Sequence, residues 1–185
     1  GLTAVLVTIG TVGTMPSESA FTEAVRSMLD FDREIARHPD TFIGIRKAAD
    51  LAAAKKAKRT GLIYGMQDGV AFESDLDRLE DLHQLGLRVV QPTYNRRNLL
   101  GDGCMETSNA GLSRAGVECI ERLNALGILV DLSHCGRQTS ADAIRASKKP
   151  VAFTHTGCVA VADHPRHRTD GELRAVAEKG GVSGV

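Results

Sequence analysis

The stretch GILVDLSHCGRQTSADAIRASKKPVAFTHTGCVAVADHPR, residues 127–166, decides the fold. Two short apolar runs within it, Ile128–Leu132 and Val151–Phe153, each end within two residues of a histidine, His134 and His155. The segment between the runs has the spacing of a single helix, so the stretch predicts a strand, a helix and a second strand. Strands joined in this way are parallel, and both histidines then leave the sheet at the same edge.

The two histidines, 21 positions apart, are the residues that we assign to a metal site. Neutral imidazole is a common ligand of zinc, and the end of a strand gives the side chain a fixed direction. The spacing alone leaves a second interpretation open, in which both histidines only hydrogen-bond to their neighbours. Asp131, just before His134, is able either to orient a metal ligand from behind or to anchor the loop.

Three further polar residues are expected near the same edge. Arg166 lies eleven residues after the second histidine, and its guanidinium suits a substrate carboxylate, with a surface ion pair as the alternative. Gln67 follows the apolar run Leu62–Met66, although an amide oxygen is a weaker metal ligand than a carboxylate. Tyr94 follows the run Leu87–Val90 and is able either to donate a hydrogen bond to a substrate or to line the pocket wall.

The remaining chain repeats the pattern of strand followed by helix. Apolar runs that predict strands begin near residues 2, 62, 87, 128, 151 and 182, and Thr41–Ile45 predicts a short extended piece. The runs are apolar throughout, which is typical of parallel strands covered on both faces. Residues 10–13, GTVG, lack the glycine pattern of dinucleotide-binding open sheets, whereas polar residues at successive strand ends are typical of a barrel. We therefore predict one domain over residues 1–185, and of the two parallel architectures we favour a TIM-type barrel over a doubly wound open sheet.

Capping residues predict where several helices begin and end. Ser74, Ser113 and Asp170 are the predicted N-caps, and Gly127 is predicted to end the helix that begins after Ser113. The segment Arg96–Gly111 is long, polar and rich in glycine, so it predicts a loop with a functional role or high mobility.

The composition argues against several classes of protein. Hydrophobic residues make up 42% and charged residues 25% of the chain, which is typical of a globular domain. The formal net charge is zero and no basic cluster occurs, so we expect no nucleic-acid partner. No apolar run approaches the roughly 18–20 residues of a membrane span, and the first residues lack the basic start of a signal peptide. The four cysteines form no CxxC pair, so we expect free thiols, Cys119 buried among them, and a cytoplasmic location.

Four segments in this order resemble the membrane (renal) dipeptidase family of zinc peptidases: QLGLRVVQPTYNRRNLLGDGC, GLSRAGVECIERLNALGILVDLSHCG, KPVAFTHTGCVAVADHPR and ELRAVAEKGGVSGV. The resemblance covers residues 61–185 and, more loosely, the residues from Leu2 onward. It implies an amidohydrolase-like (β/α)8 barrel that holds one or two zinc ions and hydrolyses a dipeptide or a related small amide. Measured against that barrel, we expect this chain to form an incomplete TIM-type (β/α)8 barrel with about six of the eight βα units. As partners we expect such a substrate and, as one option, a second copy of the chain.

The resemblance also implies roles for individual residues. His134 and His155 match the two histidines that hold one zinc ion, and Arg166 matches the arginine that binds the C-terminal carboxylate of the dipeptide. The family's bridging glutamate falls on Gln67, and its substrate-contacting histidine falls on Tyr94. The His-x-Asp pair of the family's first strand and the aspartate of its last strand have no counterpart here, so we expect little activity from this chain and assign no catalytic residue. The alternative is a non-catalytic or single-metal barrel that binds a small carboxylate-bearing ligand.

Overall fold

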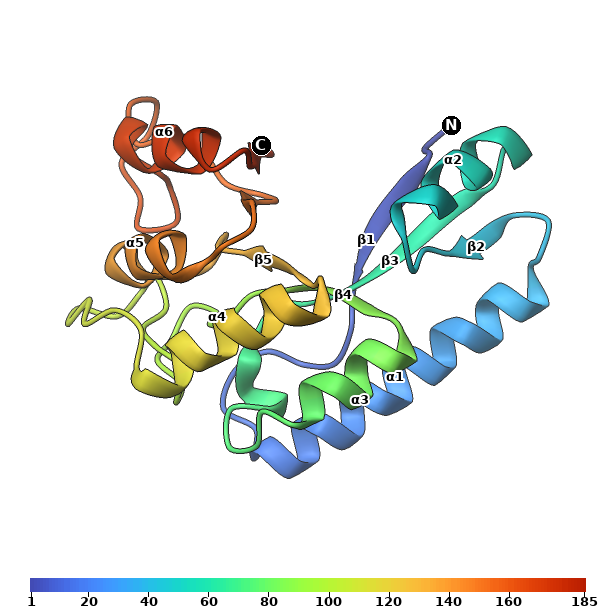
Figure 1. Cartoon of the computed structure of the whole chain (residues 1–185), viewed down its shortest axis with the longest axis horizontal. Helices are drawn as coiled ribbons and strands as arrows, with labels where there is room; N and C mark the ends of the chain where they lie inside the picture. Colours follow the sequence, from blue (N-terminus) through green and yellow to red (C-terminus); the bar gives the residue numbers. More distant parts are fainter.

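The computed structural model describes all residues, 1–185, and contains a single parallel sheet with helices packed along it (Figure 1). The strands are β1 (Ala4–Thr8), β2 (Phe42–Gly44), β3 (Thr60–Met66), β4 (Leu87–Val90), β5 (Leu129–Asp131), β6 (Val151–Phe153) and β7 (Val182–Ser183). The helices are α1 (Ser17–Arg37), α2 (Ala48–Ala57), α3 (Arg78–Leu85), α4 (Arg114–Leu126), α5 (Arg137–Ala146) and α6 (Asp170–Glu178), with a 3-10 turn at Gly69–Ala71. None of the helices combines the length and the apolar composition that crossing a bilayer requires.

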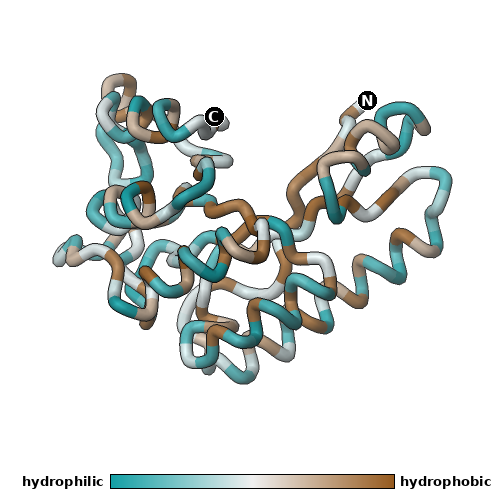
Figure 2. The backbone as a smooth tube through the Cα atoms, in the orientation of Figure 1, coloured by the Kyte–Doolittle hydropathy of each residue, from teal (hydrophilic) through white to brown (hydrophobic).

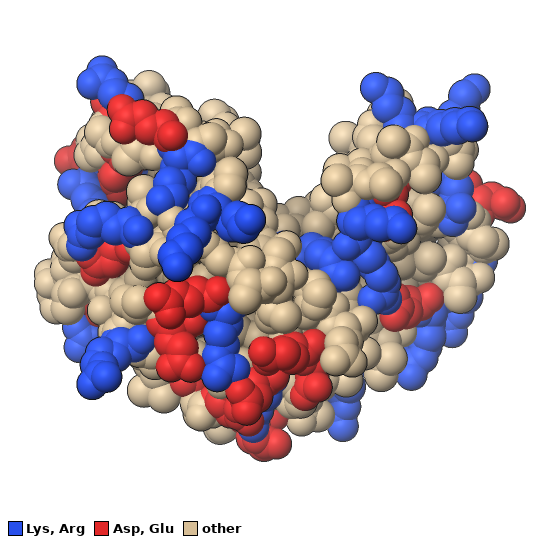
Figure 3. Space-filling view, viewed as in Figure 1, with Lys and Arg blue, Asp and Glu red and all other residues tan.

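The strands pair in the order β1-β3-β4-β5-β6-β7, all parallel, and the short β2 pairs with the start of β3. Apart from β2, sequence order and spatial order agree, which is the arrangement of a barrel built from successive βα units. In Figure 1 the strands follow an open arc, with α1, α3 and α4 on its outer side and the two chain ends facing each other across the opening. Figure 3 shows the opening as a hollow between two lobes. The structure confirms the predicted incomplete barrel.

The core lies between the strands and the helices that cover them. Leu79 and Leu82 on α3, and Cys119, Ile120 and Leu123 on α4, are almost fully buried. Their spacing of three or four residues places them on one face of each helix, which is the face that packs against the sheet. Figure 2 shows the same pattern, with apolar residues along the strands and alternating apolar and polar residues along the helices. The cysteine in this set is a free, buried thiol, as predicted.

The cap predicted for α4 is confirmed. The backbone N–H of Gly116 donates a hydrogen bond to the Ser113 hydroxyl at 3.0 Å. Gly127 ends the helix with a φ of 71°, a left-handed conformation that glycine adopts without a steric penalty. This cap and this stop fix where the chain turns from α4 into β5, the strand that leads to His134.

The two other predicted caps are wrong. Thr169, not Asp170, caps α6, because its hydroxyl accepts from the N–H of Glu172 while the Glu172 carboxylate accepts from the N–H of Thr169. Ser74 does not cap α3, because turns intervene before the helix begins at Arg78. The side chain of Ser74 hydrogen-bonds to Ser17 instead.

The loop between β4 and α4 is organised around a buried carboxylate. Asp102 accepts hydrogen bonds from Arg97 Nε at 2.6 Å, from the Ser108 hydroxyl at 2.9 Å and from the Ala110 N–H at 2.6 Å. These donors, Arg97 first, lower the pKa of Asp102 to about 2. The Thr139 hydroxyl at the start of α5 donates to the backbone carbonyl of Asp102, so the loop is tied to the helix that follows β5.

Candidate metal and substrate site

The carboxyl ends of β4, β5 and β6 bring together most of the residues predicted from the sequence. Tyr94 and Asn95 follow β4, His134 follows β5, and His155 follows β6. These strands are neighbours and parallel, so the residues that follow them meet at one edge of the sheet. The Nε2 atoms of the two histidines lie 3.1 Å apart. The pairing predicted from their spacing is therefore present in the structure.

One hydrogen bond fixes the tautomer of His134. Its Nδ1 lies 2.8 Å from Oδ1 of Asn95, and an amide oxygen only accepts, so Nδ1 carries the proton. The Cys104 thiol donates to the same oxygen at 3.3 Å. The lone pair of His134 therefore resides on Nε2, the nitrogen that faces His155.

A network around Asp131 fixes the tautomer of His155. The hydroxyls of Ser133 and Thr154 each donate to a carboxylate oxygen of Asp131 at 2.5 Å. A hydroxyl that donates its only proton in this way accepts with its lone pairs, so Nδ1–H of His155 donates to Thr154 at 2.9 Å. The lone pair of His155 also resides on Nε2. The sequence left two roles open for Asp131, orienting a metal ligand or anchoring the loop. This geometry supports the first, because Asp131 orients His155 through Thr154.

The two lone pairs that face each other fit a shared metal ion. Two nitrogens bound to one tetrahedral zinc at ~2.0–2.1 Å lie about 3.3 Å apart, close to the separation of the two Nε2 atoms. Burial, assisted by the positive charge of Arg166, lowers the pKa of His134 to about 3. Burial also lowers the pKa of His155. Both imidazoles are therefore neutral near pH 7, the protonation state that metal ligands require.

Tyr94 and Arg166 flank the histidine pair. The Tyr94 ring stacks on the His134 imidazole, with the ring centroids 3.9 Å apart and the planes 23° from parallel. Arg166 donates from Nη2 to the carbonyl oxygen of His155 at 3.2 Å, while its Nη1 is buried without a hydrogen-bond partner. Burial lowers the pKa of Arg166. A buried, unpaired guanidinium N–H beside the histidines is suited to bind a carboxylate.

Gln67 follows β3 but forms no hydrogen bond with either histidine. Its Nε2 donates to the Thr8 hydroxyl on β1 at 3.2 Å, and β4 separates β3 from β5 in the sheet. No group of three or more His, Cys, Asp or Glu side chains in the chain is arranged to hold a metal ion. The chain thus supplies two imidazoles, and the role of Gln67 as a metal ligand stays a prediction.

Two residues of the site had no role assigned from the sequence. Asn95 and Thr154 are each adjacent to a predicted site residue, and each holds the Nδ1–H of one histidine. A polar residue next to a site residue at a strand end is a hint that sequence reasoning could have used. Which hydrogen bond it makes depends on backbone geometry that the sequence does not specify.

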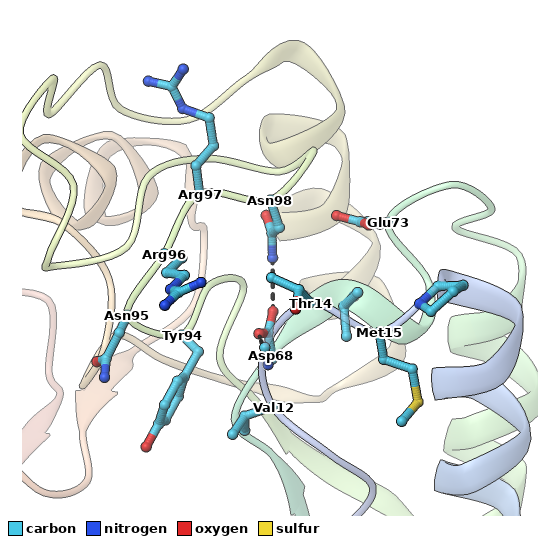
Figure 4. Close-up of a pocket in the computed structure, with 13 residues that line it drawn as sticks. Val12, Thr14, Met15, Asp68, Glu73, Tyr94, Asn95, Arg96, Arg97 and Asn98 are labelled. Atoms are coloured by element: carbon cyan, nitrogen blue, oxygen red, sulfur yellow. Dashed lines mark hydrogen bonds between the residues drawn. The ribbon is translucent and has the colours of Figure 1, made fainter.

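Two cavities are lined in part by residues of the site. The first, about 690 Å³, is bordered by Tyr94 and Asn95 and by the loop after β1 (Figure 4). In it Asp68 is held by the N–H of Gly13 at 3.1 Å and by the Asn98 amide at 2.9 Å, and burial raises its pKa. The second cavity, about 580 Å³, is lined by residues that include both His155 and Arg166. Cavities of this size accommodate small molecules.

Comparisons with known proteins agree with this arrangement. The sequence model of one family, described as membrane dipeptidase (peptidase family M19), matches residues 1–185. The solved structure of an amidohydrolase from Pseudomonas aeruginosa is similar, with a TM-score of 0.91 and 37% identity over 100% of this chain and 55% of that chain. A metallo peptidase from Rhodobacter sphaeroides, solved with a phosphinate mimic of the dipeptide L-Ala-D-Ala, has a TM-score of 0.83 and 26% identity over 98% of this chain and 59% of that chain.

A curated relative points the same way. Dipeptidase verJ of Clonostachys rogersoniana is 29% identical over 150 residues, which are 80% of this chain and 39% of that protein. The chain spans about half the length, or less, of the curated relatives it matches. With a family match over the whole sequence and a curved parallel sheet that presents paired histidines at its strand ends, the chain belongs to the membrane dipeptidase family, peptidase family M19.

Proposed function

We propose that this chain forms part of the active site of a zinc-dependent dipeptidase. The observation that supports the proposal most strongly is the pair of Nε2 atoms 3.1 Å apart, on rings whose Nδ1 atoms hydrogen-bond to Asn95 and Thr154. Membership of the dipeptidase family supports a small peptide as substrate. The relative from Rhodobacter sphaeroides, which binds a mimic of L-Ala-D-Ala, supports dipeptides that contain a D-residue as one class to test.

Each residue of the site has a distinct task in this proposal. His134 and His155 bind one Zn²⁺ through Nε2, while Asn95 and Thr154 keep the proton on Nδ1 of each ring. When bound, the ion supplies a Lewis acid for the peptide carbonyl and lowers the pKa of water. Nη1 of Arg166, unpaired and buried, binds the terminal carboxylate of the dipeptide.

Tyr94 and Gln67 have less direct tasks. The Tyr94 ring, stacked on His134, forms the wall between the histidine pair and the larger cavity. We assign Gln67 as an additional ligand, one weaker than a carboxylate because its amide is neutral. Two imidazoles and one neutral amide leave a tetrahedral shell incomplete, so we expect this chain to hydrolyse dipeptides poorly.

A second candidate function is a single-metal or non-catalytic barrel that binds a carboxylate-bearing small molecule. The specific observation in its favour is the amide of Gln67, which hydrogen-bonds to Thr8 and not to either histidine. In this case Arg166 still binds the carboxylate, but no peptide bond is cleaved. Both candidates bind a carboxylate-bearing ligand through Arg166, but only the first hydrolyses it.

The experiment compares wild type, His134→Ala and His38→Ala in zinc content and in turnover of L,L- and L,D-dipeptides. His38 follows α1 at an exposed position and serves as the matched control. We expect His134→Ala to lose most of its zinc and His38→Ala to retain it. Unchanged zinc content in His134→Ala would contradict the assignment of the metal site. Zinc and dipeptide binding with no turnover at all, without even the slow hydrolysis expected of the first candidate, would favour the second.

A further inference from the structure

We infer that Arg168 is a positioning residue that fixes the segments carrying His134 and His155 relative to each other. The inference rests on the proposed function, because it concerns the histidine pair as a metal site. Arg168 touches neither histidine side chain. It is the largest fully buried side chain in the chain, with an exposed fraction of 0%.

The guanidinium binds the backbone on both sides of His134. Nη2 of Arg168 donates to the carbonyl oxygens of Leu132, Ser133 and Cys135, at 2.8, 2.9 and 2.8 Å. These carbonyls belong to the tight turn between β5 and α5, and they enclose the position of the histidine. One guanidinium nitrogen that bonds three carbonyls of the same turn restricts the direction in which the turn presents its imidazole.

Arg168 also contacts residues on both sides of His155. Its guanidinium carbon lies 4.7 Å from the centre of the Phe153 ring, which it covers. Its backbone N–H donates to the carbonyl of Gly157 at 2.9 Å. Phe153 and Gly157 each lie two residues from His155, so one residue connects the segments that carry both candidate ligands.

The remaining contacts of the Arg168 side chain are with α5 and α6. Nη1 of Arg168 lies 3.2 Å from the Ser140 hydroxyl on α5 and 3.2 Å from a carboxylate oxygen of Glu172 on α6. Nε is buried without a partner. A buried charge that leaves one N–H unpaired is an inefficient way to stabilise a fold. Its contacts concentrate on the two turns, which supports a role in arranging the site.

The test compares Arg168→Lys with Val176→Ala in the full chain. Lysine keeps the positive charge but loses the planar fork, whereas Val176→Ala removes buried methyl groups from α6 and leaves the guanidinium contacts in place. The first readout is hydrogen–deuterium exchange of the metal-free protein, which needs no metal site. The second is titration with Co²⁺ alone, followed by visible absorbance.

We expect Arg168→Lys to accelerate exchange selectively at residues 132–136 and to weaken Co²⁺ binding about 10- to 100-fold, the range for residues that orient metal ligands. Val176→Ala should accelerate exchange more evenly and keep the Co²⁺ affinity of wild type. Equal exchange profiles in the two variants would overturn the inference. Wild type that fails to bind Co²⁺ would contradict the proposed metal site, while the exchange profiles would still decide the role of Arg168.

Two further variants keep the test decisive if the lysine variant does not fold. Ser140→Ala removes one contact of the guanidinium and should weaken Co²⁺ binding about 2- to 5-fold, and unchanged affinity would overturn the inference. Glu172→Gln removes the ionic partner, retains a side chain able to cap α6, and leaves the carbonyl contacts intact. Glu172→Gln should keep the Co²⁺ affinity of wild type. If it loses as much affinity as Arg168→Lys, the loss comes from the ion pair with Glu172 and not from the carbonyl contacts, which would overturn the inference.

Discussion

At the scale of single residues, the site depends on where two protons reside. Asn95 and Thr154 each bind the Nδ1–H of one imidazole and thereby direct both Nε2 lone pairs into the same space. Sequence spacing was sufficient to pair His134 with His155, because strand ends in a parallel sheet converge. It was not sufficient to identify the residues that set the tautomers, since these contacts depend on how each loop folds back after its strand.

The first prediction concerns Asn95. Replacing Asn95 with alanine leaves the Nδ1–H of His134 without its acceptor, so the ring is free to rotate or to change tautomer. We expect zinc affinity to fall about 10- to 100-fold, measured by competition with a chelator. Cys104→Ala is the matched control, because the Cys104 thiol donates to the same oxygen but does not touch the imidazole, and it should change the affinity less than about twofold. Equal losses in both variants would argue against the tautomer role.

The second prediction concerns pH. Burial lowers the pKa of His134 to about 3 from an ordinary value of 6.5, so the unfolded chain binds a proton that the folded chain excludes between these values. The stability of the metal-free protein should therefore fall as the pH decreases from about 6.5 toward 3. His134→Gln removes this titration and should reduce the loss of thermal stability between pH 7 and pH 5. Identical pH dependences for wild type and variant would show that the folded protein does not exclude this proton.

At the scale of elements, apolar runs were enough to predict the strands, and capping chemistry decided their connections. The strand, helix and strand of residues 127–166 form as predicted, because a buried parallel strand requires an uninterrupted apolar run. The starts of α3 and α6 were predicted wrongly. For α6, Thr169 and Asp170 are adjacent and both suit a cap, and only the reciprocal bond with Glu172 selects the threonine. Such a choice depends on a side chain three residues away.

The third prediction concerns the loop between β4 and α4, which carries Tyr94 and Asn95 at its start. Asp102→Asn should weaken the ion pair with Arg97 and lower the free energy of unfolding by about 1–3 kcal/mol at pH 7, measured in urea. The pKa of Asp102 is lowered from 3.8 to about 2, so this contribution is present above pH 4 and is lost as the pH falls toward 2. Asp142→Asn, which removes a more exposed ion pair with Arg145, is the control and should have a smaller effect. A difference from wild type that does not shrink below pH 4 would rule out the carboxylate as its source.

At the scale of the whole molecule, the chain is an arc of parallel strands around a hollow, with the candidate site at the carboxyl ends of its strands (Figure 3). The regular alternation of strand and helix predicted this architecture. The sequence did not predict that Gln67 would bond to Thr8, because side-chain rotation at a strand end is decided by its neighbours. The homodimer and the cytoplasmic location stay predictions.

The most direct test of the account is anomalous diffraction at the zinc absorption edge from crystals of the zinc-loaded protein. We predict a peak that lies about 2.0–2.1 Å from Nε2 of both His134 and His155, with Asn95 and Thr154 still bound to the opposite nitrogens. A zinc peak elsewhere in the protein, or no peak between Nε2 of His134 and Nε2 of His155, would contradict the account.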